Sequence, residues 1–339
     1  MDGEHAGVVD RGIIQVHPTR RCNLACSHCY SSSSPNERTA LRPEVIAATI
    51  EDAAALGFSV VSLSGGEPLV YEHLGEVIAA AHRVGSRVNL VSNGILIRSA
   101  RYDRQAGKFD VVALSLDGLP TRHNAIRGSD KAFGQVRAAA EELRRAKQSF
   151  GIIHTLCSES LADLEDLAAM ASDWGASLLQ LHPFEASGRG AGATDLTPLG
   201  SEERLDAFLV AAVLQEQYPQ LRIQLDLVHR EVARHFPAAI HGARLREPML
   251  PRELVLQDDG RVVPLTYGLN ARWTVVDTTR ERLANAWPRF IDTQWPMLRR
   301  RIRNACVQTA RGRHGEVVPW HALIRQYAEA PVLGAHPAG

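Results

Sequence analysis

The chain has 339 residues, of which 45% are hydrophobic and 22% charged, and its 38 basic and 38 acidic residues leave no formal net charge. This balance predicts neither a nucleic-acid partner nor attraction to a membrane surface, and no apolar run reaches the roughly 20 residues that a membrane-spanning helix needs. The short acidic N-terminus has no signal-peptide pattern, so we expect a cytoplasmic protein whose cysteines stay reduced.

Strand and helix patterns alternate along the first half of the chain. Short β-rich runs end in turn-forming residues, and most are followed by a segment with apolar residues at helical spacing. The six expected strands end near residues 19, 66, 93, 118, 156 and 182, and the clearest helices cover 43–57, 73–85, 131–147 and 161–175. Six such units imply parallel strands, either in an open doubly wound sheet or in a barrel. Both architectures place ligands at the carboxyl ends of the strands.

The composition changes after the sixth strand. Residues 186–201 are rich in Gly and Thr, and a long helix is expected over 202–218. Beyond residue 221 the pattern is less regular, although 253–265 is typical of a hairpin with Asp259-Gly260 at its turn. Two or three helices are expected after it. We therefore expect a smaller second unit behind the regular first one.

Three of the five cysteines lie within eight residues, directly after the first strand. Cys22, Cys26 and Cys29 have the spacing C-x3-C-x2-C. Three thiolates can hold a zinc ion that takes a fourth protein ligand, or three irons of a four-iron cluster whose fourth iron stays open. His28 lies between two of the cysteines and has no room to reach the same ion. An open position is what catalysis needs, so the spacing favours a catalytic iron–sulfur cluster over a structural metal site.

This spacing on the loop after a first strand resembles the signature of the radical S-adenosylmethionine (SAM) enzymes. The resemblance implies one [4Fe-4S] cluster on Cys22, Cys26 and Cys29, with SAM chelating the open iron. In that family an electron from the cluster cleaves SAM to methionine and a 5′-deoxyadenosyl radical, which removes a hydrogen atom from the substrate. An external electron donor such as flavodoxin or ferredoxin is then expected. The family usually has an aromatic residue just before the last cysteine; here that position is His28, and Tyr30 is the aromatic candidate for a cofactor contact.

The second expected strand ends in SGGEP, which resembles the second motif of the family. The resemblance implies that Gly65 and Gly66 let the backbone approach the SAM ammonium group and that Glu67 supplies a carboxylate opposite it. Taken alone, the same residues also fit an ordinary strand-to-helix turn.

Three later segments, VSNG, SLDG and HNAIRGSDKAF, are similar to the family's next SAM-binding segments. They imply that Ser92 and Asn93 bond the ribose or carboxylate of SAM, and that Ser115 and Asp117 lie near the ribose or the substrate. Arg127 would pair with the SAM carboxylate through its bidentate guanidinium. The alternative for SLDG is a plain Asp-Gly turn.

The resemblance covers about half the chain and implies an α/β fold built on a partial (β/α)6 TIM-like barrel. We accordingly expect an N-terminal tail over 1–12, the radical SAM barrel over 13–219 and a smaller α+β cap domain over 220–339.

The region after the barrel is similar to the SPASM or twitch extension of one branch of the family, which binds auxiliary iron–sulfur clusters. Leu265 stands where that extension has a cysteine, and only Cys306 remains farther on. We therefore expect a SPASM-like cap without auxiliary metal and a single cluster in the whole chain. This favours redox-neutral outcomes such as epimerisation, decarboxylation, dehydration or rearrangement over oxidative crosslinking.

A substrate radical formed in this way needs a hydrogen-atom donor, and a thiol has a weak S–H bond. Cys157, just past the fifth strand, is the first candidate and Cys306 the second; the ordinary alternative is a small buried apolar residue. Polar residues at the same rim are candidates for substrate contacts: His154, His182, Glu185 and Tyr267. We expect catalytic roles for Cys157, His182 and Glu185, with His182 as a general base.

The substrate class is open. Only about a dozen residues precede the first strand, so we expect none of the leader-binding domains of many peptide maturases. We expect a small natural product such as a nucleoside or sugar, with ribosomal-peptide modification (an epimerase or crosslinker) as the alternative. A metal-stabilised binding module belongs to another class, as does a hydrolase using His182 and Glu185, which would leave the three cysteines unexplained.

Overall fold

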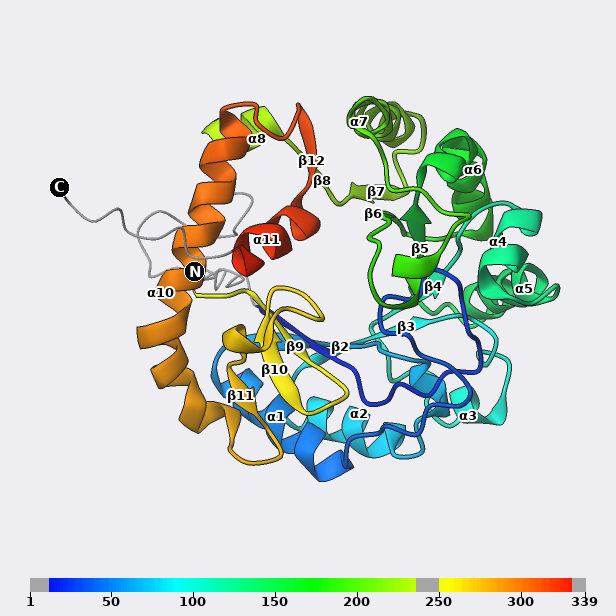
Figure 1. Ribbon diagram of the computed structural model, residues 1–339. Helices are drawn as coiled ribbons and strands as arrows, with labels where there is room; N and C mark the ends of the chain where they lie inside the picture. The colour runs from blue at the N-terminus through cyan, green and yellow to red at the C-terminus, as the bar shows by residue number, and fades with distance from the viewer. Residues whose placement is uncertain (1–11, 236–249, 331–339) are drawn as a thin grey trace, which may run out of the picture.

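A single ten-stranded sheet forms the centre of the computed structural model, which describes residues 12–235 and 250–330 (Figure 1). The strand order is β11-β10-β9-β1-β2-β3-β4-β5-β6-β7. Strands β1 to β7 pair in parallel, β9 is parallel to β1, and β10 and β11 are antiparallel to their neighbours. The strands are β1 Gly12–Val16, β2 Phe58–Leu63, β3 Arg87–Ser92, β4 Val111–Ser115, β5 Phe150–Leu156, β6 Leu178–Pro183, β7 Arg222–Leu225, β9 Glu253–Leu256, β10 Arg261–Pro264 and β11 Val276–Asp277.

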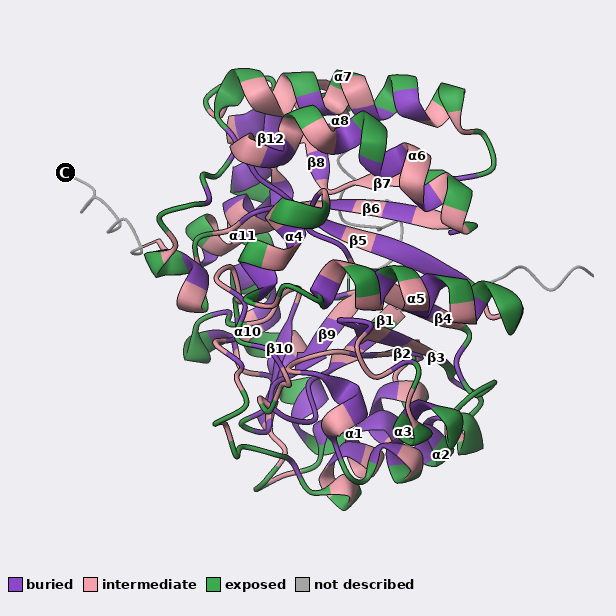
Figure 2. Ribbon diagram, turned by 90° about the vertical axis from the view of Figure 1, so that its right-hand side faces the viewer, coloured by how far each residue is buried: buried purple, intermediate pink, exposed green. Residues whose placement is uncertain are grey.

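Helices cover the outer face of the parallel strands. They are α1 Pro43–Ala55, α2 Leu74–Arg83, α3 Ala100–Asp103, α4 Pro120–Arg127, α5 Ala132–Arg145, α6 Leu164–Trp174 and α7 Ser201–Gln217. In α5 the buried residues recur at helical spacing, as in Val136, Ala139, Ala140 and Leu143, so one stripe packs on the sheet and the rest faces solvent (Figure 2). These findings confirm the α/β partial barrel.

The opposite face of the strands is more polar. In β1, Ile14 and Val16 are completely buried, whereas Gln15 between them is half-buried. Gln15 aligns with Ser62 of β2, and Ser62 aligns with Asn89 of β3. A layer of polar side chains therefore lines the concave side of the sheet, which is suited to holding a polar ligand.

The second part of the chain lies against the open side of the barrel (Figure 1). It contains β8 Leu227–His229, α8 Arg230–His235, α10 Leu283–Ala310, β12 Val317–Pro319 and α11 Trp320–Glu329, and β8 pairs with β12. The hairpin predicted over 253–265 is confirmed as β9 and β10. Two or three helices were expected behind it, and the long one, α10, continues through Pro288 and Pro296.

The central sheet crosses the predicted domain boundary at residue 219. Strand β7 adds a seventh parallel strand next to β6, and β9 extends the sheet beyond β1. Asp52 of α1 also accepts two hydrogen bonds from the Arg282 guanidinium, at 2.6 and 2.9 Å, just before α10. Because the two parts share one sheet, the sheet marks no boundary between them. The division into a barrel and a cap stays a prediction. Within the described ranges, no helix is long and apolar enough to cross a membrane.

Candidate iron–sulfur and SAM site

The three clustered cysteines lie on the long loop between β1 and α1. The Cys22 amide donates to Ser34 O at 3.1 Å, and the Cys29 amide donates to Cys26 O at 3.3 Å. A second segment, η3 Gly188–Gly192, lies across this loop, where the Arg189 guanidinium donates to Cys26 O at 2.7 Å and to Ser33 O at 2.6 Å. A side chain far along the chain therefore holds the loop that carries the thiols.

The environment of the thiols fits iron–sulfur ligation. Asn93 Nδ2 lies 3.8 Å from Cys22 Sγ, and an Arg127 guanidinium nitrogen lies 3.7 Å from Cys26 Sγ, so two of the three sulfurs have a nitrogen donor beside them. All five cysteines lie in the described ranges, and none of them forms a disulfide there. Among the described residues no three ligating side chains converge on one ion position, which a four-iron cluster does not require because each thiolate binds a different iron.

The protonation of these thiols also bears on ligation. Burial raises the pKa of Cys22 to about 12, and it raises the pKa of Cys26 although Arg127 works against the rise. The Cys22 and Cys26 thiols are therefore protonated at neutral pH until a metal replaces their protons.

Glu67 joins the ends of β2 and β3 beneath the cysteine loop. Its carboxylate accepts hydrogen bonds from Ser92 Oγ at 3.0 Å, from the Asn93 amide at 2.9 Å and from the Leu69 amide at 3.2 Å. Burial outweighs these hydrogen bonds and raises the pKa of Glu67 to about 7. Ser92 Oγ and the Asn93 backbone N–H thus bond Glu67 itself. The SAM contacts expected for these three residues stay predictions.

The glycines before Glu67 are required by the cysteine loop itself. A Cβ on Gly66 would lie 2.2 Å from Arg21 O, and Gly65 has a φ of +104° and lies against His17 and Thr19. The sequence motif predicted that the backbone at these glycines approaches the SAM ammonium group. On one side, the glycines instead lie against the backbone of the protein itself.

Asp117 and Arg127 form a buried ion pair at the end of β4, with an oxygen–nitrogen distance of 2.5 Å. His28 Nε2 lies 3.1 Å from the same Asp117 oxygen, and the Asp117 amide donates to His123 Nδ1 at 3.0 Å. Burial disfavours the charge, but Arg127 and His28 hold the pKa of Asp117 well below its usual range. Arg127 is thus neutralised within the protein, while its Nε is a buried donor without a hydrogen-bond partner in the described structure. That free donor suits the carboxylate of SAM.

Tyr30 belongs to an aromatic group beside the cysteines. Tyr267 stacks on His17 with ring centroids 4.6 Å apart, and its edge meets Tyr30 at 5.2 Å. The Tyr267 hydroxyl donates to Asp258 at 2.7 Å. Tyr267 brings the hairpin of the second part directly to the cysteine loop.

Ser115 is the last residue of β4 and is half-buried on the concave side.

Cys157 and His154 lie in closed surroundings. Cys157 is 1% exposed and packs with Ile126, Phe184 and Leu196, and burial raises its pKa. His154 is completely buried, with one ring nitrogen 2.9 Å from Leu116 O and the other 3.0 Å from Ser160 Oγ. The substrate contact expected for His154 is therefore wrong, because both ring nitrogens are occupied by protein. The donor role of Cys157 stays a prediction that would need this apolar group to open.

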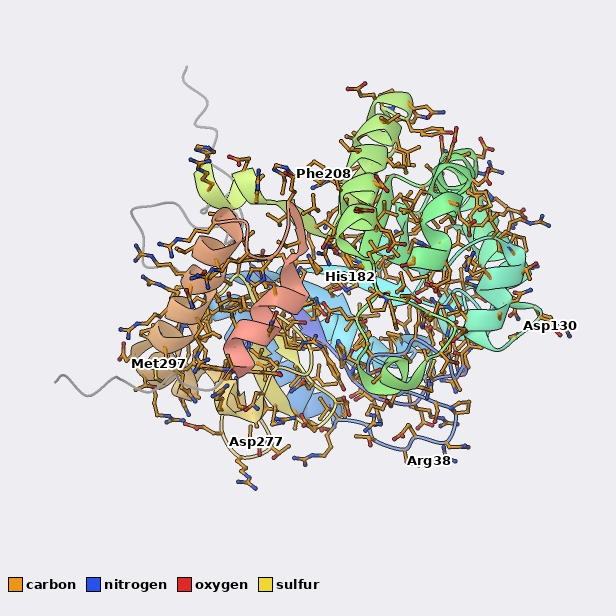
Figure 3. The ribbon with its side chains drawn as sticks, turned by 45° about the horizontal axis from the view of Figure 1, so that its top comes forward. Arg38, Asp130, His182, Phe208, Asp277 and Met297 are labelled. Carbon is orange, nitrogen blue, oxygen red and sulfur yellow. The ribbon has the colours of Figure 1, made fainter. Side chains whose placement is uncertain are left out.

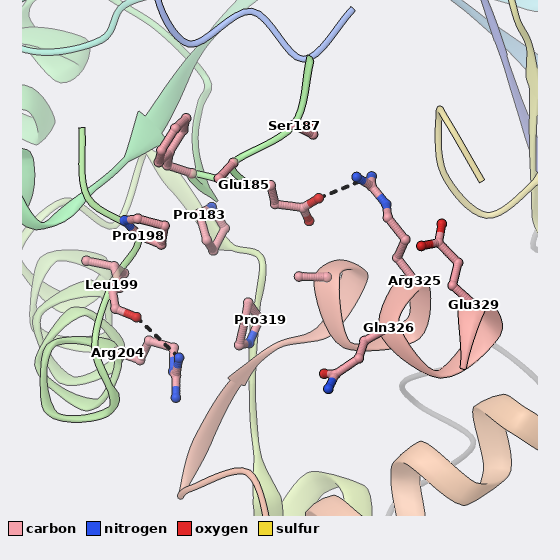
Figure 4. A pocket seen from close by; sticks show the side chains of 13 residues that line it. Pro183, Glu185, Ser187, Pro198, Leu199, Arg204, Pro319, Arg325, Gln326 and Glu329 are labelled. Atoms are coloured by element: carbon pink, nitrogen blue, oxygen red, sulfur yellow. Dashed lines mark hydrogen bonds and ion pairs between the residues drawn. The ribbon is translucent and has the colours of Figure 1, made fainter. Parts of the chain in front are cut away.

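Glu185 faces the second part of the chain across a cavity of about 360 Å³ (Figure 4). Its carboxylate forms an ion pair with Arg325 of α11 at 3.1 Å. The lining includes Phe184, Glu185, Leu199, Arg204, Pro319 and Arg325. Glu185 therefore links the end of β6 to α11. The catalytic role expected for Glu185 stays a prediction, because its carboxylate is already paired with Arg325.

His182, half-exposed near the end of β6, forms an ion pair with Asp226 at 2.9 Å. A free general base was expected here. Sequence reasoning missed two partners in this region, Asp226 and His321, which no motif marks. It also missed the contact of Arg189 with the cysteine loop, although HPFEASGRG resembles the sixth-strand end of the family.

Comparison with known proteins supports the class of protein that the site suggests. Residues 16–171 match the model of the Radical SAM superfamily, a match over slightly less than half of the chain. Its relatives include the pre-heme d1 synthase of Dinoroseobacter shibae, 32% identical over 51% of this chain and 43% of that protein. The mycofactocin maturase MftC of Mycolicibacterium smegmatis is 33% identical over 55% of this chain and 48% of the relative.

Solved structures show the same fold. Streptococcus suis SuiB bound to the precursor peptide SuiA has a TM-score of 0.66 at 15% identity, covering 82% of this chain and 64% of SuiB. The chain spans about half the length of the curated relatives it matches.

Proposed function

We propose that this protein uses one [4Fe-4S] cluster and SAM to remove a hydrogen atom from a peptide substrate. The observation that carries the proposal is the position of the three clustered cysteines, where Asn93 after β3 and Arg127 at the end of α4 bring hydrogen-bond donors to two of the sulfurs. When bound, the cluster and SAM supply a reducing electron and the 5′-deoxyadenosyl radical.

The residues of the chain have separate roles in this proposal. Asn93 and Arg127 stabilise the thiolates by donating to their sulfurs, and the free Nε of Arg127 is available to a carboxylate. Asp117 keeps the Arg127 guanidinium in place by its ion pair. Glu67 holds the strand ends together, and Tyr30 contacts the bound cofactor. The aromatic group of His17, Tyr30 and Tyr267 shields the loop from water on the side of the hairpin.

A peptide is favoured over the small molecule that the sequence suggested first. MftC is a maturase, and SuiB was solved with a precursor peptide. The cavity between β6 and α11 has both apolar walls and charged groups, as a peptide side chain with its backbone requires. The haem-related relative makes a tetrapyrrole the competing substrate class.

We also propose that the second part is a SPASM-like cap without an auxiliary cluster. Cys157 and Cys306 lie in different hydrophobic clusters, one behind β5 and one in α10. Two separated thiols do not supply the ligands of a cluster of the usual kind. The reaction is then redox-neutral, such as an epimerisation.

The test starts with anaerobic purification, reconstitution with iron and sulfide, and counting of iron. We expect about four irons per chain, the content of one such cluster. With SAM and dithionite we expect 5′-deoxyadenosine, and both are lost when the three cysteines are changed together to Ala. Eight irons would contradict the single-cluster proposal, and zinc in place of iron would contradict the proposed chemistry.

The substrate class is tested by deuterium transfer. Peptides deuterated at Cα and a carboxylate-rich tetrapyrrole with deuterated side chains are supplied separately. Deuterium in 5′-deoxyadenosine from the peptide alone supports the proposal. Transfer from the tetrapyrrole alone would overturn the peptide assignment and leave the cluster assignment intact.

A further inference from the structure

Two histidines from distant parts of the chain meet where the barrel contacts the second part. His182 near the end of β6 and His321 of α11 have ring centroids 6.1 Å apart, with ring planes inclined by 48°. The His182 side chain is 41% exposed, and it lies between the barrel helices and α11 (Figure 3). The residues that follow the two histidines, Pro183 and Ala322, line the cavity of Figure 4. His182 is therefore partly open to solvent, His321 is half-buried, and both are next in the chain to residues that line the cavity.

His182 is held in one orientation by its neighbours. Its Nδ1 lies 2.9 Å from Asp226 Oδ2, and Gln180 Nε2 donates to the same oxygen at 2.9 Å. Asp226 therefore fixes Nδ1 as the protonated nitrogen bonded to protein, and Nε2 remains for a ligand.

The charges around His182 decide its protonation. Burial lowers the pKa of His182, but Asp226, Glu185 and Glu253 outweigh burial, and the pKa is raised above its ordinary value. The pKa of Asp226 is lowered in turn, since His182 and Gln180 outweigh burial. The carboxylate of Asp226 therefore favours the doubly protonated form of His182, in which Nε2 can donate a hydrogen bond.

His321 has the opposite character. Burial and the neighbouring His182 lower its pKa, Arg325 adds to this, and Asp226 and Glu185 only partly oppose it. Near neutral pH the His321 imidazole is uncharged and has a lone pair to accept a hydrogen bond. The site thus offers one donor and one acceptor side by side, a separation of roles typical of paired titratable groups in functional sites.

We propose that His182 and His321 together hold one extended residue of a peptide, His182 donating to its carbonyl and His321 accepting from its N–H. This inference deepens the proposed function and rests on it. In an extended chain the N–H and C=O of one residue project from the same edge, so two neighbouring imidazoles can bond both. The Cα of that residue is then held in a fixed orientation. Asp226 is a positioning residue, because it acts through His182.

The surrounding charge supports a neutral amide rather than an anion. Asp226 is paired with His182 and Glu185 with Arg325, so these two ion pairs leave no net charge beside the imidazoles. A carboxylate group of a tetrapyrrole entering here would find no unpaired cation among these four side chains. A peptide unit carries no charge and satisfies both imidazoles.

The experiment uses the reconstituted full chain and a randomised library of hexapeptides capped at both ends. Peptides retained by the wild-type protein are identified by mass spectrometry, and their binding is compared in His182→Gln, His321→Gln and the control His73→Gln. His73 is exposed and pairs only with neighbouring groups on the barrel surface. We expect at least a fivefold loss of affinity in each of the first two variants and none in the control.

Methylation of a single backbone nitrogen of the peptide tests the hydrogen bond to His321 more directly. Methylating one amide of a retained peptide should weaken binding to the wild type about tenfold, and the same change should have little further effect in His321→Gln. Binding should also fall at low pH as His321 gains a proton and at high pH as His182 loses one. The Asp226→Asn variant should move the alkaline loss to lower pH.

Three outcomes would overturn the inference: no peptide retained above the bare support, equal affinities in all variants, or N-methylation effects that do not depend on His321. Because a variant can misfold, the imidazole resonances of the wild-type protein are also titrated, with those of His182 and His321 assigned from the variants that fold. Equal pKa values for the two rings would contradict their assigned roles. None of these measurements needs SAM cleavage, so a failure to form 5′-deoxyadenosine would count against the proposed function alone.

Discussion

Gly66 lies where the SGGEP turn packs on the backbone of the cysteine loop. Because a Cβ there would lie 2.2 Å from Arg21 O, a side chain must push the loop away. The contact involves backbone on both sides, so no side-chain rotation can relieve it. The position of the thiols therefore depends on the absence of one methyl group.

We expect Gly66→Ala to reduce iron incorporation at least tenfold while the barrel still folds. The matched control is Gly134→Ala, since a Cβ at Gly134 in α5 meets nothing within 4 Å. In a helix that control is stabilising by about 0.5–1 kcal/mol. Iron per chain after reconstitution, together with the circular dichroism spectrum, makes the comparison. Full iron loading in Gly66→Ala would show that the loop tolerates the shift.

Asp117 is the second residue on which the site depends. Removing its charge leaves Arg127 buried without a counterion, and breaking a buried pair in this way costs about 3–5 kcal/mol. We expect Asp117→Asn to lower the urea midpoint of the metal-free protein accordingly. The exposed pair of Arg137 and Glu141 is the control, and Glu141→Gln should change stability by less than about 1 kcal/mol. Equal effects would contradict a structural role for the buried pair.

The same carboxylate predicts an acid limb of stability. The folded-state pKa of Asp117 is lowered, so its stabilisation is complete above its unfolded pKa of about 3.9. It is lost as pH falls through the folded pKa. Asp117→Asn should therefore flatten the pH dependence of unfolding below about pH 4, and an unchanged acid limb would assign it to other groups.

At the scale of elements, β9 brings a carboxylate into the concave side of the barrel. Glu253, the first residue of β9, accepts a short hydrogen bond from Gln15 of β1, and burial raises the pKa of Glu253 to about 7 in spite of it. The folded protein thus binds the proton of the Glu253 carboxyl more tightly than the unfolded chain does. Stability contributed by Glu253 is greatest below its unfolded pKa of about 4.3 and decreases as pH rises to 7.

We expect Glu253→Gln to be more stable than the wild type at pH 8, by on the order of 1–3 kcal/mol. The advantage should shrink towards pH 4.5, because the wild-type carboxyl is then protonated. Gln keeps a carbonyl oxygen for the Gln15 amide. Urea midpoints at the two pH values measure the effect, with the exposed Glu316→Gln as control. A difference independent of pH would mean that packing rather than ionisation is responsible.

The sequence predicted some elements well and others not at all, for physical reasons. The motifs after β1 to β4 lie at strand ends. The turns there depend on residues that are neighbours in the sequence, such as the glycines of SGGEP, so the sequence predicts them. Asp226 and His321 become partners of His182 only through the pairing of β6 with β7 and the packing of α11. Long-range pairing of this kind leaves no periodic signal, and for the same reason the parallel pairing of β9 with β1 was not foreseen.

At the scale of the whole molecule, the shared sheet makes the two parts depend on each other. Strand β1 is paired on one side with β2 and on the other with β9, and β6 is paired with β7. A chain ending at residue 219 would expose both β1 and β6 as sheet edges. Unpaired edges with apolar neighbours favour aggregation.

We therefore expect the fragment 1–219 to lack a cooperative unfolding transition, in contrast to the full chain. Circular dichroism in increasing urea and limited proteolysis measure this directly. The reason is the loss of the hydrogen bonds and apolar burial that β9 and β7 supply. A fragment that unfolds cooperatively and resists proteolysis would establish the predicted barrel as an independent domain.

The pairing of β1 with β9 also has a consequence for protein synthesis. Residues Ile13 to Val16 pair with Glu253 to Leu256, so the first strand leaves the ribosome long before its second neighbour is made. At about 5–20 residues per second, the gap of roughly 240 residues corresponds to about 10 to 50 s of translation. During that time β1 has an open edge, next to the loop that carries the three clustered cysteines. Cluster loading in the cell is then best timed after release of the finished chain, and factors that shield nascent strands should increase the yield of iron-loaded protein.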